Sequence, residues 1–147
     1  MLVDSEGKQL PINHFIVSSL HVIPRNQYEA MRDFLLSRVM DWIKSKSDSF
    51  GVKELVGKSV FGDEYWKKTP LQWLYDYYEE GGTKTNTSSQ DEQSDEAFNK
   101  ARMLSGNVLY AVLADESLQE KFVKERDTTC IPNRNLYRSF RSIPDVE

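Results

Sequence analysis

Residues 26–46, NQYEAMRDFLLSRVMDWIKSK, carry a wide apolar face at helical spacing. The main stripe consists of Met31, Leu35, Val39 and Trp42, with Leu36, Met40 and Ile43 beside it. Polar residues keep only a narrow strip, so we expect a central helix that is packed on several sides. Asn26 is a typical helix start, because its side chain can accept a hydrogen bond from first-turn N–H groups and Glu29 follows three residues later.

The clearest helix signal lies C-terminal to this segment. Thr69 and Pro70 are suited to a cap and a first helical position, because the N–H that proline lacks would be unpaired there. Leu71, Leu74, Tyr75 and Tyr78 then form one helical face, and Gly81-Gly82 ends the pattern. Residues 82–94 contain no apolar side chain, so we expect them to form a flexible polar loop.

Two shorter segments show helical spacing before residue 60. Residues 12–23 favour a short helix capped by Asn13, although their β-branched residues leave a buried strand open as an alternative. Residues 52–56 are expected to form a short helix or a strand. Residues 1–10 are polar and are expected to be a loose N-terminus.

The pattern becomes helical again after the polar loop. Ser94 can cap a helix whose first turn contains acids, as the helix dipole favours. Ser105-Gly106-Asn107 predicts a turn or a kink, and residues 108–116 then resume the helical spacing.

The last part of the chain predicts two short strands, at residues 121–126 and 136–140. The residues between them contain Pro132-Asn133, which is typical of a turn. The predicted fold is therefore α+β and mainly α, with four or five helices and a C-terminal two-stranded β-hairpin. A chain of 147 residues is the usual size of one domain, so we expect residues 1–147 to form a single unit.

Charge is distributed unevenly along the chain, whose net charge is −4. Residues 61–96 hold three lysines and nine acids, whereas residues 121–141 hold six basic residues and two acids. An acidic total argues mildly against a general nucleic-acid binder, but a local basic segment can still attract a partner.

Cysteine usage and hydropathy predict a soluble cytoplasmic protein. Cys130 is the one cysteine, so no intrachain disulfide can form, as is usual in a reducing compartment. The N-terminus lacks the features of a signal peptide, and the longest mainly apolar stretch, residues 15–23, is too short to span a bilayer.

No residue pattern indicates an enzyme, a metal site or a cofactor. His14 and His21 are seven residues apart, so neither a helix nor a strand brings both to one zinc ion. Phosphate-binding, dinucleotide-binding and nucleophile-elbow motifs are not found. We therefore expect a non-enzymatic protein, and an active site assembled from distant residues is a minor alternative.

Residues 70–141 resemble the general pattern of winged-helix DNA-binding domains. A capped helix, the turn at residues 105–107, a second helix and a basic ribbon follow one another in that order. The resemblance implies that residues 107–116 occupy the position of the recognition helix and that the ribbon is the wing. Ala101 and Gly106 are five residues apart rather than the common four, and residues 108–113 are almost wholly apolar.

Two functional hypotheses follow. The first is a regulatory or accessory protein that binds nucleic acid, with DNA as the expected partner, through the basic hairpin. Its candidate residues are Lys121, Lys124, Arg126, Arg134, Arg138 and Arg141. The second is a protein–protein interaction module, an accessory or inhibitory factor, that uses Trp73, Tyr77 and the acidic region 61–96.

Overall fold

The computed structural model describes residues 1–45, 49–56, 68–79, 90–127 and 134–140, and of residues 90–98, 127 and 134 it describes only the backbone. Within these residues, five α-helices and one three-stranded sheet form a mainly α structure of the α+β class. The predicted fold class is confirmed.

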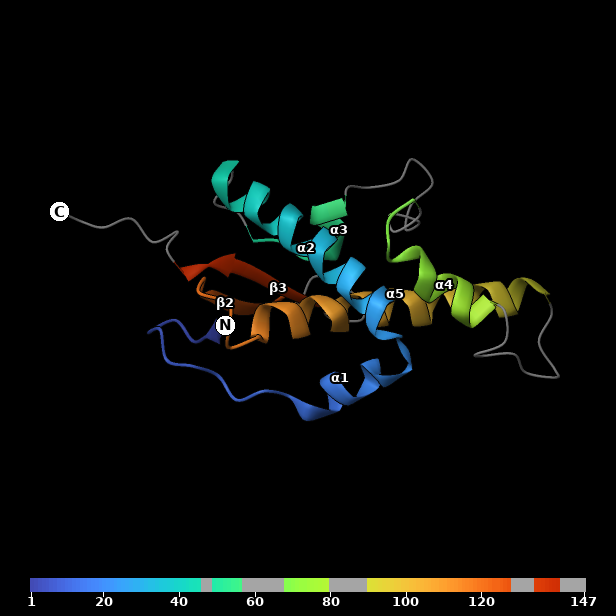
Figure 1. Cartoon of the computed structure of the whole chain (residues 1–147), viewed down its shortest axis with the longest axis horizontal. Helices are drawn as coiled ribbons and strands as arrows, with labels where there is room; N and C mark the ends of the chain where they lie inside the picture. The colour runs from blue at the N-terminus through green and yellow to red at the C-terminus, as the bar shows by residue number, and fades with distance from the viewer. Residues whose placement is uncertain (46–48, 57–67, 80–89, 128–133, 141–147) are drawn as a thin grey trace.

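The longest helix, α5 (Gln90–Ala114), runs through the molecule, and the other elements pack around it (Figure 1). Helix α2 (Arg25–Ser45) crosses it on one side, and α1 (His14–Ser18) with the 3₁₀-helix η1 (Ser19–Val22) covers another. The central helix predicted at residues 26–46 is confirmed as α2. Its buried side chains are those of the predicted stripe, Met31, Leu35 and Val39.

The short N-terminal helix is held by polar contacts. The Asn13 side chain accepts hydrogen bonds from the backbone N–H groups of Phe15 and Ile16, so the predicted cap is confirmed and residues 14–18 are helical. The Asn13 backbone N–H donates to the Tyr110 hydroxyl at 2.8 Å. The Asn107 amide donates to the Ser19 hydroxyl at 3.0 Å. These two contacts fasten α1 and η1 to α5.

Helix α3 (Val52–Val56) is helical, which decides between the two alternatives left open for these residues. Helix α4 (Gln72–Tyr77) begins two residues later than Pro70, the start that the sequence predicts. The reason is that residues 69–71 form a tighter turn, in which the N–H of Gln72 donates to the carbonyl of Thr69. The Thr69 hydroxyl accepts from the backbone N–H of Leu71 and so still caps this turn.

The sheet contains one strand that the sequence does not predict. Strands β2 (Phe122–Asp127) and β3 (Arg134–Ser139) form the expected antiparallel hairpin. Strand β1 (Leu2–Val3) pairs in parallel with β2, so the expectation of a loose N-terminus is wrong for this part of residues 1–10. Leu2 and Val3 are both buried, and this burial places the strand in the sheet. Two residues are too short to show a strand pattern in the sequence.

The chain turns tightly after β1. The Asp4 carboxylate accepts hydrogen bonds from the backbone N–H groups of Glu6 and Lys8, both at 2.9 Å. Gly7 has a φ of +87°, which favours glycine, and a Cβ at this position would lie 2.9 Å from the Phe140 ring. The turn thus allows the N-terminal segment to fold back beside the end of the hairpin.

Helix α5 corrects two predictions. It is continuous through Ser105, Gly106 and Asn107, so of the two alternatives predicted there, a turn or a kink, the turn is wrong. The Ser105 hydroxyl is buried and donates to the carbonyl of Ala101 at 2.8 Å, which satisfies this polar group inside the helix. The helix also begins at Gln90 rather than Ser94, so residues 90–94 of the predicted loop are helical, and residues 82–89 lie outside the described residues.

The winged-helix resemblance does not extend to this part of the structure. Residues 107–114 are the end of α5 rather than a separate recognition helix. The apolar residues there explain the difference, because Val108, Leu109, Val112 and Leu113 are buried in the core.

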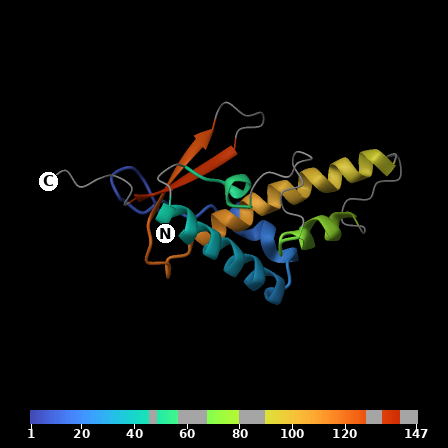
Figure 2. The same cartoon turned by 90° about the horizontal axis from the view of Figure 1, so that it is seen from above.

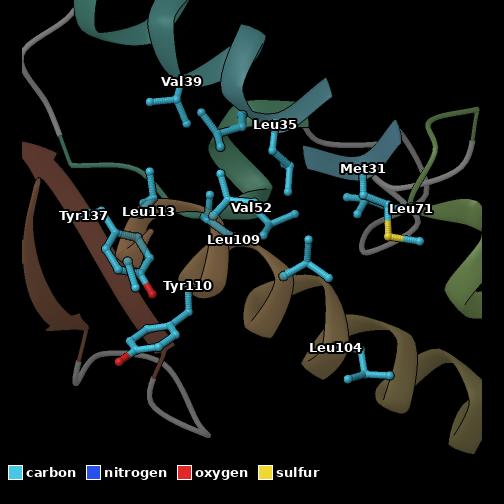
Figure 3. Close-up of a cluster of buried hydrophobic side chains, with 14 of the residues drawn as sticks. Met31, Leu35, Val39, Val52, Leu71, Leu104, Leu109, Tyr110, Leu113 and Tyr137 are labelled. Atoms are coloured by element: carbon cyan, nitrogen blue, oxygen red, sulfur yellow. The ribbon is translucent and has the colours of Figure 1, made fainter. Parts of the chain in front are cut away.

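An aromatic cluster joins the sheet to the helices. Phe50 is fully buried, and its ring lies 6.1 Å from that of Phe122 and 6.2 Å from that of Tyr137. The backbone N–H groups of Phe50 and Tyr137 each donate to the carbonyl of the other residue, at 2.7 and 2.8 Å. Figure 3 shows Tyr137 and the side chains of α2 and α5 converging on the same core. Burial raises the pKa of Tyr137 well above its usual value, so its hydroxyl stays neutral.

We expect Phe50→Ala to lower the free energy of unfolding by about 3–5 kcal/mol, because it leaves a cavity among packed rings. Phe15→Ala is the matched control, since Phe15 is 91 % exposed. Its effect should stay within about 0.5 kcal/mol. Urea unfolding measures both, and equal losses would contradict the assignment of Phe50 to the core.

We expect Gly7→Ala to destabilise the protein by about 1–3 kcal/mol, since an L-residue is strained at this φ and its Cβ would meet the Phe140 ring. Lys8→Ala changes the neighbouring exposed residue and should be nearly neutral. Thermal unfolding followed by circular dichroism compares the two, and an unchanged melting temperature in Gly7→Ala would show that the turn tolerates a side chain.

Candidate nucleic-acid interface

The hairpin divides the predicted basic residues between two faces. Side chains alternate along a strand, so Lys124 and Arg126 share one face of the sheet and Arg138 lies on the other. Lys121 precedes β2 and is exposed. Arg134 is placed by its backbone at the start of β3, and Arg141 lies outside the described residues.

The first face carries cations without described acids beside them. Lys124 and Arg126 are both exposed, and their partners across the hairpin are Tyr137 and Asn135. The Lys124 ammonium lies 5.7 Å from the centre of the Tyr110 ring, within the range of a cation–π contact. Because Tyr110 is buried in α5, this contact steadies the base of the basic strand against the core.

The second face is electrically mixed. Arg138 lies 3.4 Å from the carboxylate of Glu125, which also accepts a hydrogen bond from the Ser49 hydroxyl. The Arg138 side chain is only 23 % exposed, so this cation is largely committed to its partner. The register places Arg134 opposite Asp127. The exposed positive charge at the hairpin that could contact a phosphate is therefore concentrated on Lys121, Lys124 and Arg126.

The acidic part of the sequence lies at the other end of the molecule. Figures 1 and 2 show α4 beside the first half of α5, while the hairpin adjoins the last turns of α5. Asp76 and Glu79 in and after α4 are exposed, and the first two turns of α5 contain Asp91, Glu92, Asp95 and Glu96. A helix of 25 residues is about 37 Å long. This length exceeds the ~8 Å screening length at physiological salt several-fold, so the acids barely affect the hairpin.

The alternative site, on α4, contains stacked aromatic rings. Trp73 and Tyr77 have ring centres 5.2 Å apart with an angle of 18° between their planes. The rings of Tyr77 and Tyr78 have centres 5.0 Å apart and are nearly perpendicular, with an angle of 83° between their planes. Leu71 and Leu74 are fully buried, whereas Trp73 and Tyr77 are half-buried, and Trp73 packs against the hydrophobic core.

The structure adds two residues that sequence reasoning missed. Tyr110 supports Lys124, and Ser49 supports the Glu125 carboxylate that holds Arg138. A tyrosine within the apolar residues 108–113 was a usable signal, since a buried hydroxyl usually has a partner. Nothing local could indicate Ser49, which is 76 residues away from Glu125.

The described residues do not indicate a metal site or a membrane-spanning helix. His14 and His21 are both exposed, and the described part of the chain contains no group of three or more metal-ligating side chains placed to hold an ion. Cys130 lies outside the described residues. No described helix has the length and apolar character needed to cross a membrane.

Comparisons with protein-family models, with curated proteins and with solved structures gave no match to this chain.

We expect Arg138→Ala to lower the free energy of unfolding by about 0.5–1 kcal/mol, because it removes a half-buried ion pair and leaves Glu125 without this cation. Arg126→Ala, at an exposed position, should change stability far less. Urea unfolding of both variants is the measurement, and a larger loss for Arg126→Ala would contradict this division of the two faces.

Proposed function

We propose that this protein is a non-enzymatic regulatory or accessory factor that binds nucleic acid, with DNA as the main candidate, through the β2–β3 hairpin. The observation that supports the proposal best is the exposure of Lys121, just before β2, and of Lys124 and Arg126 on β2, at the end of the molecule away from α4 and from the acidic first turns of α5. Phosphate groups could approach this end without meeting the acids of α4 or of the first turns of α5, although Asp115, Glu116 and Glu120 lie between α5 and β2.

The expected affinity rests on phosphate contacts. Each cation that neutralises a phosphate releases a counterion and adds about 0.9 to the slope of log affinity against log salt for duplex DNA. Three exposed cations therefore predict modest, strongly salt-dependent binding with little sequence preference. Binding of this kind is typical of a factor whose complex with nucleic acid is stabilised by additional contacts, for example from another protein.

The acidic net charge is compatible with this proposal. Repulsion from the acids of α4 and of the first turns of α5 is screened over the length of α5.

We expect Lys124→Ala/Arg126→Ala to weaken DNA binding at least about tenfold at 0.1 M salt and to reduce the slope against salt by about 2. Arg25→Ala/Lys44→Ala removes the same charge from exposed positions on α2 and serves as the control. Fluorescence anisotropy with labelled duplex and single-stranded DNA, over a salt series, is the measurement.

Arg134→Ala/Arg138→Ala should weaken binding less than Lys124→Ala/Arg126→Ala, because Arg138 is committed to Glu125. No binding of the unaltered protein at low salt would overturn the proposal. Equal losses in the hairpin and α2 variants would overturn the assignment of the hairpin.

A second candidate function is protein–protein interaction through α4, and the stacking of Trp73 on Tyr77 favours it. Rings that hold each other in place lose little conformational freedom on binding, and Trp and Tyr dominate interface hot spots.

A further inference from the structure

The aromatic face of α4 is suited to a cationic partner. The stacked rings of Trp73 and Tyr77 are half-buried, and the faces of aromatic rings attract ammonium and guanidinium groups. Asp76, one residue before Tyr77, is exposed and accepts a hydrogen bond from the Gln72 amide at 3.1 Å. Glu79 is exposed as well. From Thr69 to Glu79 the chain itself contains no lysine or arginine, and Lys68 precedes this stretch.

This chain itself carries basic residues whose charge is opposite to that of Asp76 and Glu79. Lys121, Lys124 and Arg126 are exposed on the hairpin, and Lys124 and Arg126 share one face. One molecule cannot bring the two surfaces together, because α5 holds them at opposite ends (Figures 1 and 2). A second copy can do so without any change of shape.

We propose that the α4 face of one molecule, Trp73 and Tyr77 with Asp76 and Glu79, binds the basic hairpin of a second copy of this chain. In this contact Lys124 and Arg126 of the second copy lie against the stacked rings and beside the two carboxylates. The inference names the partner of the α4 surface, so it rests on the second candidate function and not on nucleic-acid binding.

The two surfaces differ, so the contact is heterologous and leaves one free α4 face and one free hairpin on each pair. Association therefore continues head to tail rather than stopping at a dimer. Because exposed charges carry much of the attraction, the assembly weakens as salt rises.

Sedimentation velocity of the full chain over a range of protein concentrations tests the proposal at 20 mM and 500 mM NaCl. At 20 mM NaCl the average sedimentation coefficient should rise with concentration beyond that of a dimer, and at 500 mM it should return toward the monomer. A monomer at every concentration in low salt would overturn the inference, and DNA binding by that monomer would leave the proposed function standing.

Complementary variants make the test specific. The hairpin variant is Lys124→Ala/Arg126→Ala, and the α4 variant is Asp76→Asn/Glu79→Gln, which keeps the rings and the size of both side chains. Each variant alone should remain close to monomeric. Their equimolar mixture should form a dimer and nothing larger, because each molecule keeps one intact end.

Asp33→Asn/Asp41→Asn is the matched control, since it removes two exposed carboxylates from α2. It should associate like the unaltered protein, whereas Tyr77→Ala should associate several-fold more weakly. The inference is overturned if the α2 and α4 variants lose association equally, since net charge alone would then govern it, or if the mixed variants fail to form a dimer.

Discussion

The second half of α5 is apolar on most of its surface, and the surrounding elements cover these apolar sides. Its buried residues are Ala101, Leu104, Ser105, Val108, Leu109, Tyr110, Val112, Leu113 and Ala114. A narrow strip of this part of the helix, which includes Arg102, Met103, Gly106 and Asn107, reaches water, so the helix requires neighbours on its other sides. Helices α1, α2, α3 and α4 all contact α5, and the Tyr137 side chain of β3 joins the same core.

That constraint also separates the two candidate surfaces. The hairpin adjoins the end of α5 that carries Tyr110, while α4 lies along the first half of the same helix (Figure 1). The basic and acidic parts of the sequence are thereby held apart by a rigid element. Charge patterning along the chain becomes charge separation in space, on which both the nucleic-acid proposal and the self-association proposal depend.

The candidate site could be only partly predicted from the sequence. Composition and strand patterns locate a basic hairpin, but they treat its six cations as equivalent. The register divides them, because Arg138 faces Glu125 while Lys124 and Arg126 face neither of the hairpin's two acids. A shift of the pairing by one residue would reverse these faces, and long-range packing against Tyr110 and Phe50 selects the register that is observed.

Local signals in the sequence determined the elements whose stability is local: the apolar stripe of α2, the Asn13 cap and the two strands of the hairpin. Only the tertiary structure decided that Leu2 and Val3 form a strand and that α5 continues through Ser105, Gly106 and Asn107. A two-residue strand exists because a distant strand pairs with it, and a turn signal is overridden when burial of the flanking apolar residues stabilises the helix more.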